Sequence, residues 1–188
     1  MEIPSDFFST RSNPFTKEQI ARLKRSIDSP LPEDYLEFLS LYGGGVISES
    51  YSRVQLKTDD SSLLEVEATM IFGNIAPIDI WENSIQLDPT WLHDWAFYFC
   101  EASNPPEDKI LLNLSNEKFK IGSVLYEDEG KIFQVSDDFT SFISLLTKNR
   151  RDQPETHKRI SDKFGNFHIP SKTIKKIEVP NLNPDRDR

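Results

Sequence analysis

Carboxylates gather at three places in this 188-residue chain, and they are the first side chains to consider for chemistry. The groups are Asp59-Asp60, Glu65 with Glu67, and Glu127-Asp128-Glu129. General acid–base catalysis needs a carboxyl whose pKa is raised by burial, whereas these residues fall in predicted turns or on the wet face of a predicted strand. Calcium coordination by residues 127–129 is an alternative, but no Asp-x-Asp-x-Asp-Gly loop is present. We interpret the three groups as candidate partner-binding residues.

Two interpretations of these carboxylates stay open. Exposed carboxylates can replace nucleic-acid phosphates against the basic cleft of an enzyme, and their summed field would accelerate encounter with a basic protein. The alternative is a solvated acidic surface that only keeps the protein in solution. The first interpretation concerns the whole field and not a single residue.

Charge is unevenly distributed along the chain. Residues 1–148 carry a net charge of −13, and residues 149–188 carry a net charge of +4. A body this acidic argues against direct binding to nucleic acid, which requires cations that neutralise phosphates. The N-terminal residues lack the basic and apolar regions of a signal peptide, and no apolar run approaches the length of a membrane span. We therefore expect a cytoplasmic protein that binds neither nucleic acid nor membrane.

The three histidines and the single cysteine form no recognisable catalytic or metal-binding arrangement. Cys100 follows His93 by seven residues, but a zinc site needs about four ligands. His157 and His168 lie in the basic C-terminal segment. Cys100 lies in an aromatic run and is predicted to be a buried small hydrophobic residue rather than a nucleophile. We expect no catalytic residue, no metal site and no cofactor.

Tryptophans are the remaining candidates for a binding surface, because Trp is enriched at interface hot spots and also anchors domain cores. Trp91 follows Asp88-Pro89-Thr90, and we predict that it is partly exposed and contacts a partner. Trp95 begins an apolar run and is predicted to belong to the core.

Two adjacent helices are predicted near the N-terminus. Thr16 and Gln19 form a candidate capping box at the start of the first. The second spans Leu31–Tyr42, with Pro32 at its first helical position and acidic residues in its first turn. Its predicted buried face consists of Leu31, Tyr35, Phe38, Leu39 and Tyr42.

Three glycines, Gly43 to Gly45, are predicted to end the second helix. A phosphate-binding loop would need a following Lys-Ser/Thr, and Val46-Ile47-Ser48 follows instead. These glycines also lie at the carbonyl end of a helix, where the dipole repels phosphate.

Alternating and apolar runs predict strands after these helices. They are the Val54–Leu56 run, Leu64–Phe72, Trp95–Cys100, Ile110–Leu114, Ser123–Tyr126 and Ile132–Val135. Spacing within Pro77–Leu87 is compatible with a short helix. A third helix carries Phe139, Phe142, Ile143 and Leu146, with Ser136 or Asp137 as its predicted cap. These elements predict an α+β fold, with a mainly antiparallel twisted sheet of about five to six strands packed against helices.

The composition changes after Lys148, which predicts a domain at 1–148 and a basic C-terminal extension at 149–188. The extension has too many apolar residues for a purely disordered tail and too few for a core of its own. We expect it to dock partly on the domain, with Asn181–Arg188 frayed.

The order of the motifs is specific. A Leu-Pro-x-x-Tyr-x-x-Phe-Leu helix ends in glycines, and an acidic strand-rich middle follows. Gly122-Ser123-Val124-Leu125-Tyr126, a charged turn and the helix opening at Asp138-Phe139 complete the pattern. This order resembles the SUKH superfamily over roughly residues 15–148. Family members usually carry Asn-Gly-Gly after the helix; Gly43 replaces the asparagine, and both residue types tolerate positive φ, so we expect the turn to be retained.

The resemblance implies a non-enzymatic binding protein. Bacterial members of the superfamily typically neutralise a cognate toxin, often a nuclease or another nucleic-acid-directed enzyme, by covering its active surface. Fungal members regulate cell-wall synthesis, so an intracellular scaffold or regulator is the alternative function, and an enzyme is a third. The motif residues are structural, and toxin-contacting positions vary with the partner. Whether the chain forms a homodimer is left open.

Overall fold

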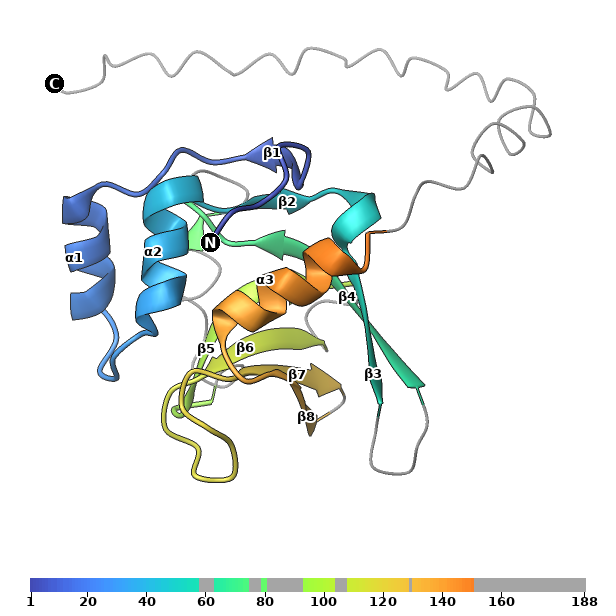
Figure 1. The fold of residues 1–188 in the computed structure, drawn as a ribbon. Helices are drawn as coiled ribbons and strands as arrows, with labels where there is room; N and C mark the ends of the chain where they lie inside the picture. Colours follow the sequence, from blue (N-terminus) through green and yellow to red (C-terminus); the bar gives the residue numbers. More distant parts are fainter. Residues whose placement is uncertain (58–62, 75–78, 81–92, 104–107, 129, 151–188) are drawn as a thin grey trace, which may run out of the picture. The chain divides into compact units, whose positions relative to one another are not determined.

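Seven strands form one antiparallel path in the order β1-β2-β4-β5-β6-β7-β8, and β3 pairs with β4 beside it (Figure 1). This computed structural model describes residues 1–57, 63–74, 79–80, 93–103, 108–128 and 130–150. The strands are β1 (Phe8–Arg11), β2 (Gly45–Ile47), β3 (Arg53–Lys57), β4 (Leu63–Ile71), β5 (Ala96–Ala102), β6 (Lys109–Asn113), β7 (Val124–Asp128) and β8 (Lys131–Ser136). The named helices are α1 (Lys17–Arg25), α2 (Glu33–Tyr42), the 3-10 turn η1 (Glu49–Tyr51) and α3 (Phe139–Lys148).

The predicted capping box begins α1. The backbone N–H of Gln19 donates to Thr16 Oγ1 at 3.2 Å, and Gln19 Oε1 accepts from the Thr16 backbone N–H at 2.8 Å. Two of the N–H groups that a helix start leaves unpaired are therefore satisfied. Phe15 and Leu23 are buried, which fixes the apolar side of this helix against the body.

The predicted second helix is confirmed as α2, with one correction at its start. Pro32 occupies the cap position, one residue before the first helical residue. At the other end the Gly43 N–H donates to the Leu39 carbonyl at 2.9 Å, and Gly43 has φ 70° and ψ −136°. A Cβ on Gly43 would lie 2.4 Å from the Asn13 carbonyl oxygen. The glycine both permits this backbone conformation and leaves room for the adjacent chain.

Aromatic side chains join α2 and α3 to the sheet. The Phe139 ring centroid lies 5.1 Å from that of Tyr35 and 5.5 Å from that of Phe99 on β5. Phe142 lies 5.7 Å from Phe99. Figure 1 shows both helices lying across one face of the sheet. The buried spacing predicted for the third helix is thus confirmed, and it supplies the core.

The cap of α3 differs from the prediction. Asp138 is the cap, and its carboxylate accepts a hydrogen bond from the Ser141 N–H at 2.7 Å. Ser136 is the last residue of β8, and the Asp137 carboxylate accepts from the Gln134 side chain instead. The helix therefore begins one or two residues later than predicted.

The α+β class and the antiparallel sheet are confirmed, but the predicted strand count was too low. β1 and β2 were not predicted; they pair with each other, and β2 also pairs with β4. Most of Pro77–Leu87, where a helix was considered, lies outside the described residues. The described residues belong to one compact unit, Met1–Asp152. No helix in this described part has the length and apolar character needed to cross a membrane.

Candidate partner-binding surface

Glu65 and Glu67 lie on β4, where Arg53 of the neighbouring strand pairs with both. Arg53 Nη1 lies 3.2 Å from Glu65 Oε1, and Arg53 Nε lies 3.4 Å from Glu67 Oε1. Register places Arg53 directly opposite Glu67. All three side chains are partly exposed, so the pairs are screened by water. The predicted acidic strand face therefore presents one net negative charge from these three residues rather than two.

The prediction that residues 127–129 form an exposed acidic turn is wrong for Glu127. It lies in β7 rather than in the turn, and its side chain is only 9% exposed. Its Oε2 lies 3.5 Å from Nζ of Lys109, which is 11% exposed, and its Oε1 lies 3.2 Å from Nε2 of His93. A charge with so little exposure to water requires a charged or hydrogen-bonding partner, and Lys109 and His93 supply it. Glu127 is a structural ion-pair residue and presents little charge to a partner.

His93 and Trp95 stack beside this ion pair. Their ring centroids are 4.6 Å apart at an interplanar angle of 16°. Trp95 precedes β5 and is half-buried, so it packs at the margin of the core rather than within a strand as predicted. Nothing in the local sequence indicated this cluster, because His93 and Lys109 come from segments 34 and 18 residues from Glu127.

Asp128 is the last residue of β7 and is half-buried. It is opposite Lys131 in the hairpin register, and Gly130 in the connecting turn has φ 80°, as the sequence predicted for this turn. Of the three residues 127–129, Asp128 is the one that the structure describes as a partly accessible carboxylate.

The described candidate residues form two patches rather than one surface. Glu65 and Glu67 lie on β4, and Asp128 lies on β7, with β5 and β6 between these strands in the sheet. Three strand spacings of about 4.8 Å lie between these strands, so the two patches are at least about 14 Å apart. Asp59, Asp60, Trp91 and Glu129 lie outside the described residues, and their partner-binding role stays a prediction.

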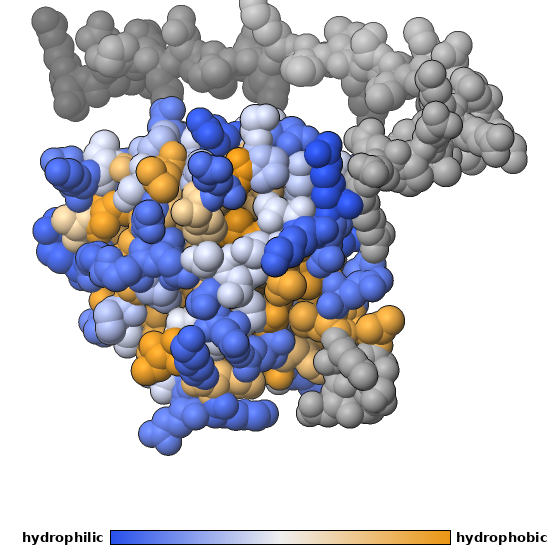
Figure 2. Space-filling model, in the orientation of Figure 1, coloured by the Kyte–Doolittle hydropathy of each residue, from blue (hydrophilic) through white to orange (hydrophobic). Residues whose placement is uncertain are grey.

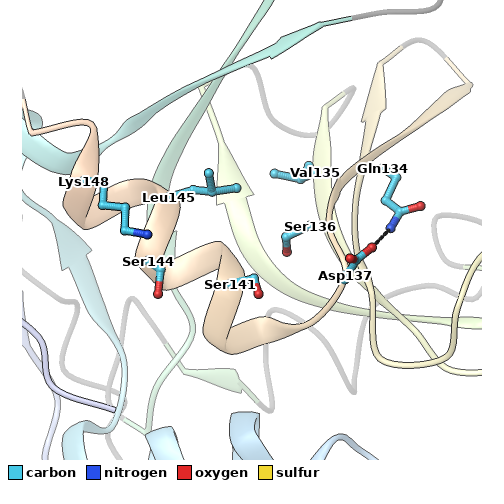
Figure 3. A pocket seen from close by; sticks show the side chains of 8 residues that line it. All are labelled: Gln134, Val135, Ser136, Asp137, Ser141, Ser144, Leu145 and Lys148. Carbon is cyan, nitrogen blue, oxygen red and sulfur yellow. Dashed lines mark hydrogen bonds between the residues drawn. The ribbon is translucent and has the colours of Figure 1, made fainter.

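A groove of about 640 Å³ lies between β8 and α3 (Figure 3). It is lined by Gln134, Val135, Ser136, Asp137, Ser141, Ser144, Leu145 and Lys148. Gln134 Nε2 donates to Asp137 Oδ1 at 2.7 Å across one end. Asp137 precedes α3 and Lys148 ends it, so the groove has an anionic and a cationic end with hydroxyl groups between them. This lining suits hydrogen bonding to a polar protein segment. This groove was not predictable from local sequence, because the residue pattern of β8 or of α3 alone does not indicate a space between the two elements.

The single cysteine occupies a buried position in the core. Cys100 is fully buried on β5, and burial raises the pKa of its thiol well above the usual value. The prediction of a small buried hydrophobic residue is confirmed. Among the residues that the structure describes, no group of three or more His, Cys, Asp or Glu side chains is placed to hold a metal ion.

Apolar side chains on the face drawn in Figure 2 form separate groups interrupted by hydrophilic residues. Large hydrophobic residues that are strongly exposed include Leu41, Leu63 and Ile121, each on a different element or loop. A partner that uses apolar contacts would therefore meet small anchors within a polar surface.

Comparison with protein-family models gives a match to the SMI1 / KNR4 family (SUKH-1) over residues 14–145. The matched region begins just before α1 and ends within α3, so it contains both helical motifs and most of the sheet. A comparison with curated proteins found no match.

Proposed function

This chain belongs to the SMI1 / KNR4 family (SUKH-1), and from that premise we propose that it is an immunity protein that binds and neutralises a cognate protein toxin. The toxin is a nuclease or another basic, nucleic-acid-directed effector, and binding covers its active surface. The proposal assigns no catalytic step and no cofactor to this chain. It places the protein in the cytoplasm, where such a toxin would reach nucleic acid.

The charge distribution carries this proposal. Residues 1–148 hold a net charge of −13, and an acidic protein surface attracts a protein whose own active cleft is basic because it binds phosphates. Asp128, Glu65 and Glu67 are the described members of the proposed contact set; Asp59, Asp60, Trp91 and Glu129 complete it. Glu127 contributes by holding Lys109 and His93 in place.

Co-expression tests the proposal directly. The protein encoded by the adjacent gene should arrest growth when expressed alone, and this chain should restore growth and co-purify with it. The association rate should fall steeply as salt rises, because screening shortens the range of the acidic field. A chain that neither binds this protein nor restores growth would contradict the proposal.

The family also includes fungal cell-wall-synthesis regulators, and the same pull-down separates the two functions. A scaffold or regulator should capture several partners, whereas an immunity protein should capture one toxin.

We further propose that the domain ends near residue 148 and that 149–188 form a basic extension. Comparing the pull-down with and without 149–188 measures what the extension contributes to partner binding.

A further inference from the structure

The connection between β6 and β7, residues 114–122, is a loop whose two ends are held together. The Asn113 N–H donates to the Ser123 carbonyl at 2.9 Å, and the Gly122 N–H donates to the Asn113 carbonyl at 2.8 Å. Gly122 has φ 86°, which allows the chain to turn back into β7. Closed loops of this length with adjacent ends are compact Ω-loops.

A buried side chain fixes the interior of this loop. Asn113 is fully buried, and its Nδ2 lies 3.1, 3.0 and 3.0 Å from the carbonyl oxygens of Asn116, Phe119 and Lys120. Its Oδ1 accepts from the Asn116 N–H at 2.8 Å. Asn116 Oδ1 in turn accepts from the Lys118 N–H at 2.9 Å. The loop backbone is therefore tied to one buried amide and is ordered before any partner arrives.

The side chains that this loop presents differ from the rest of the body. Ile121 is 63% exposed, and Lys118 and Lys120 are also exposed. Lys118 Nζ lies 5.2 Å from the centroid of the half-buried Phe119 ring. The loop thus presents an exposed aliphatic side chain, two exposed cations and one exposed carboxylate, that of Glu117. Its own net charge is +1, within a region whose net charge is −13. Binding through this rigid loop avoids the entropy cost of ordering a flexible one.

We propose that loop 115–121 is the anchor of the toxin interface, with Ile121 entering an apolar pocket of the toxin whose rim carries carboxylates. Lys118 and Lys120 contact those carboxylates, because opposite charges meet across an interface. The acidic patches on β4 and β7 contact basic parts of the toxin instead. This inference rests on the proposed immunity function. The acidic patches then set the rate of encounter, and the loop sets the lifetime of the complex.

Binding kinetics with the protein encoded by the adjacent gene, in a catalytically inactive form, test the inference. Ile121→Ser in the full chain removes the anchor without changing the net charge. Leu41→Ser is the matched control, since Leu41 is an exposed aliphatic residue on α2 (49% exposed). We expect Ile121→Ser to raise the dissociation rate about tenfold, with the association rate changed by less than about twofold. Lys118→Gln should raise the dissociation rate less, and Leu41→Ser should leave both rates unchanged.

Each other outcome overturns a distinct claim. If Ile121→Ser and Leu41→Ser dissociate at the same rate as the unaltered chain, the toxin binds elsewhere and only the loop inference fails. If the unaltered chain does not bind at all, the immunity function fails as well. If sedimentation shows a dimer that Ile121→Ser converts to a monomer while toxin binding is unchanged, the loop is a contact between two copies. Urea unfolding of each variant verifies that it is folded.

Discussion

The Asp34 carboxylate in the first turn of α2 holds the first turn of α3, through two hydrogen bonds from Thr140. Asp34 Oδ2 accepts from the Thr140 backbone N–H at 2.9 Å and from its hydroxyl at 3.1 Å. Its Oδ1 accepts from the Tyr35 N–H at 3.0 Å. Asp34, which places negative charge at the positive end of the α2 dipole, therefore also accepts from an otherwise unpaired N–H group of α3.

Asp34→Ala should lower the free energy of unfolding by about 1–2 kcal/mol, because it leaves that N–H group without its acceptor. Thr140→Ala removes only the hydroxyl and should cost less. Urea unfolding of the two single variants and the double variant measures the coupling. Additive losses would show that the two helices are not joined through this contact.

Gly43 should tolerate no side chain. Gly43→Ala is expected to lower the free energy of unfolding by more than about 2 kcal/mol, because it combines a strained backbone conformation with a clash at the Asn13 carbonyl. Gly130→Ala is the control, since Gly130 also has positive φ but nothing lies within 4 Å of its Cβ position. That variant should lose only about 1 kcal/mol. Equal losses in urea would mean that the contact with Asn13 contributes nothing.

Tyr35 offers a substitution that should not destabilise the protein. Its hydroxyl is buried and finds no hydrogen-bond partner among the described residues. Tyr35→Phe should therefore leave the free energy of unfolding unchanged or raise it by up to about 1 kcal/mol. Tyr51 is equally buried, but its hydroxyl donates to Asp6 Oδ1 at 2.8 Å, so Tyr51→Phe should cost about 1 kcal/mol. Thermal unfolding of both variants compares them, and a marked loss for Tyr35→Phe would contradict this view.

Local patterns made the helices predictable from sequence. The capping box of α1, the apolar spacing of α2 and α3, and the glycines after α2 each lie within a few consecutive residues. β1 and β2 carried no such pattern. Three of the four residues of β1 are exposed, and β2 has three residues and begins with glycine. Their stability comes from pairing with each other and with β4, which lies far along the chain.

The candidate site was predictable only in part, for a similar reason. Glu65 and Glu67 alternate with apolar residues, so their placement on a partly exposed strand face followed from the sequence. Glu127 looked like a turn residue because it precedes Asp128 and Gly130. Its burial depends on Lys109 from the neighbouring strand and on His93 from another segment. Local sequence contains no information about such distant partners.

Glu127 and Asp128 should respond differently to neutralisation. Glu127→Gln should lower the free energy of unfolding by about 1–3 kcal/mol, because the poorly exposed Lys109 loses its charged partner. Asp128→Asn should change stability by less than about 0.5 kcal/mol and should instead slow association with the toxin. Unfolding and association kinetics on the same two variants separate these effects. A slowed association for Glu127→Gln at unchanged stability would return Glu127 to the binding surface.

Asp138 should make part of the stability depend on pH. Hydrogen bonds from the hydroxyl and backbone N–H of Ser141 lower the pKa of this carboxyl below its ordinary value of 3.8 in the folded state. The unfolded chain then binds the proton more tightly, so the contribution is complete above about pH 5 and is lost as pH falls through the lower folded-state pKa. Asp138→Asn retains an acceptor but cannot titrate. Its stability deficit at pH 7, up to about 1 kcal/mol, should therefore shrink toward pH 3.

Urea unfolding of the unaltered chain and Asp138→Asn at several pH values between 7 and 3 measures this change, since all other carboxyls titrate in both proteins. Ser141→Ala should weaken the pH dependence without abolishing it, because the backbone N–H of residue 141 still donates to Asp138. A deficit that stays constant down to pH 3 would show that the Asp138 cap is not what couples α3 to pH.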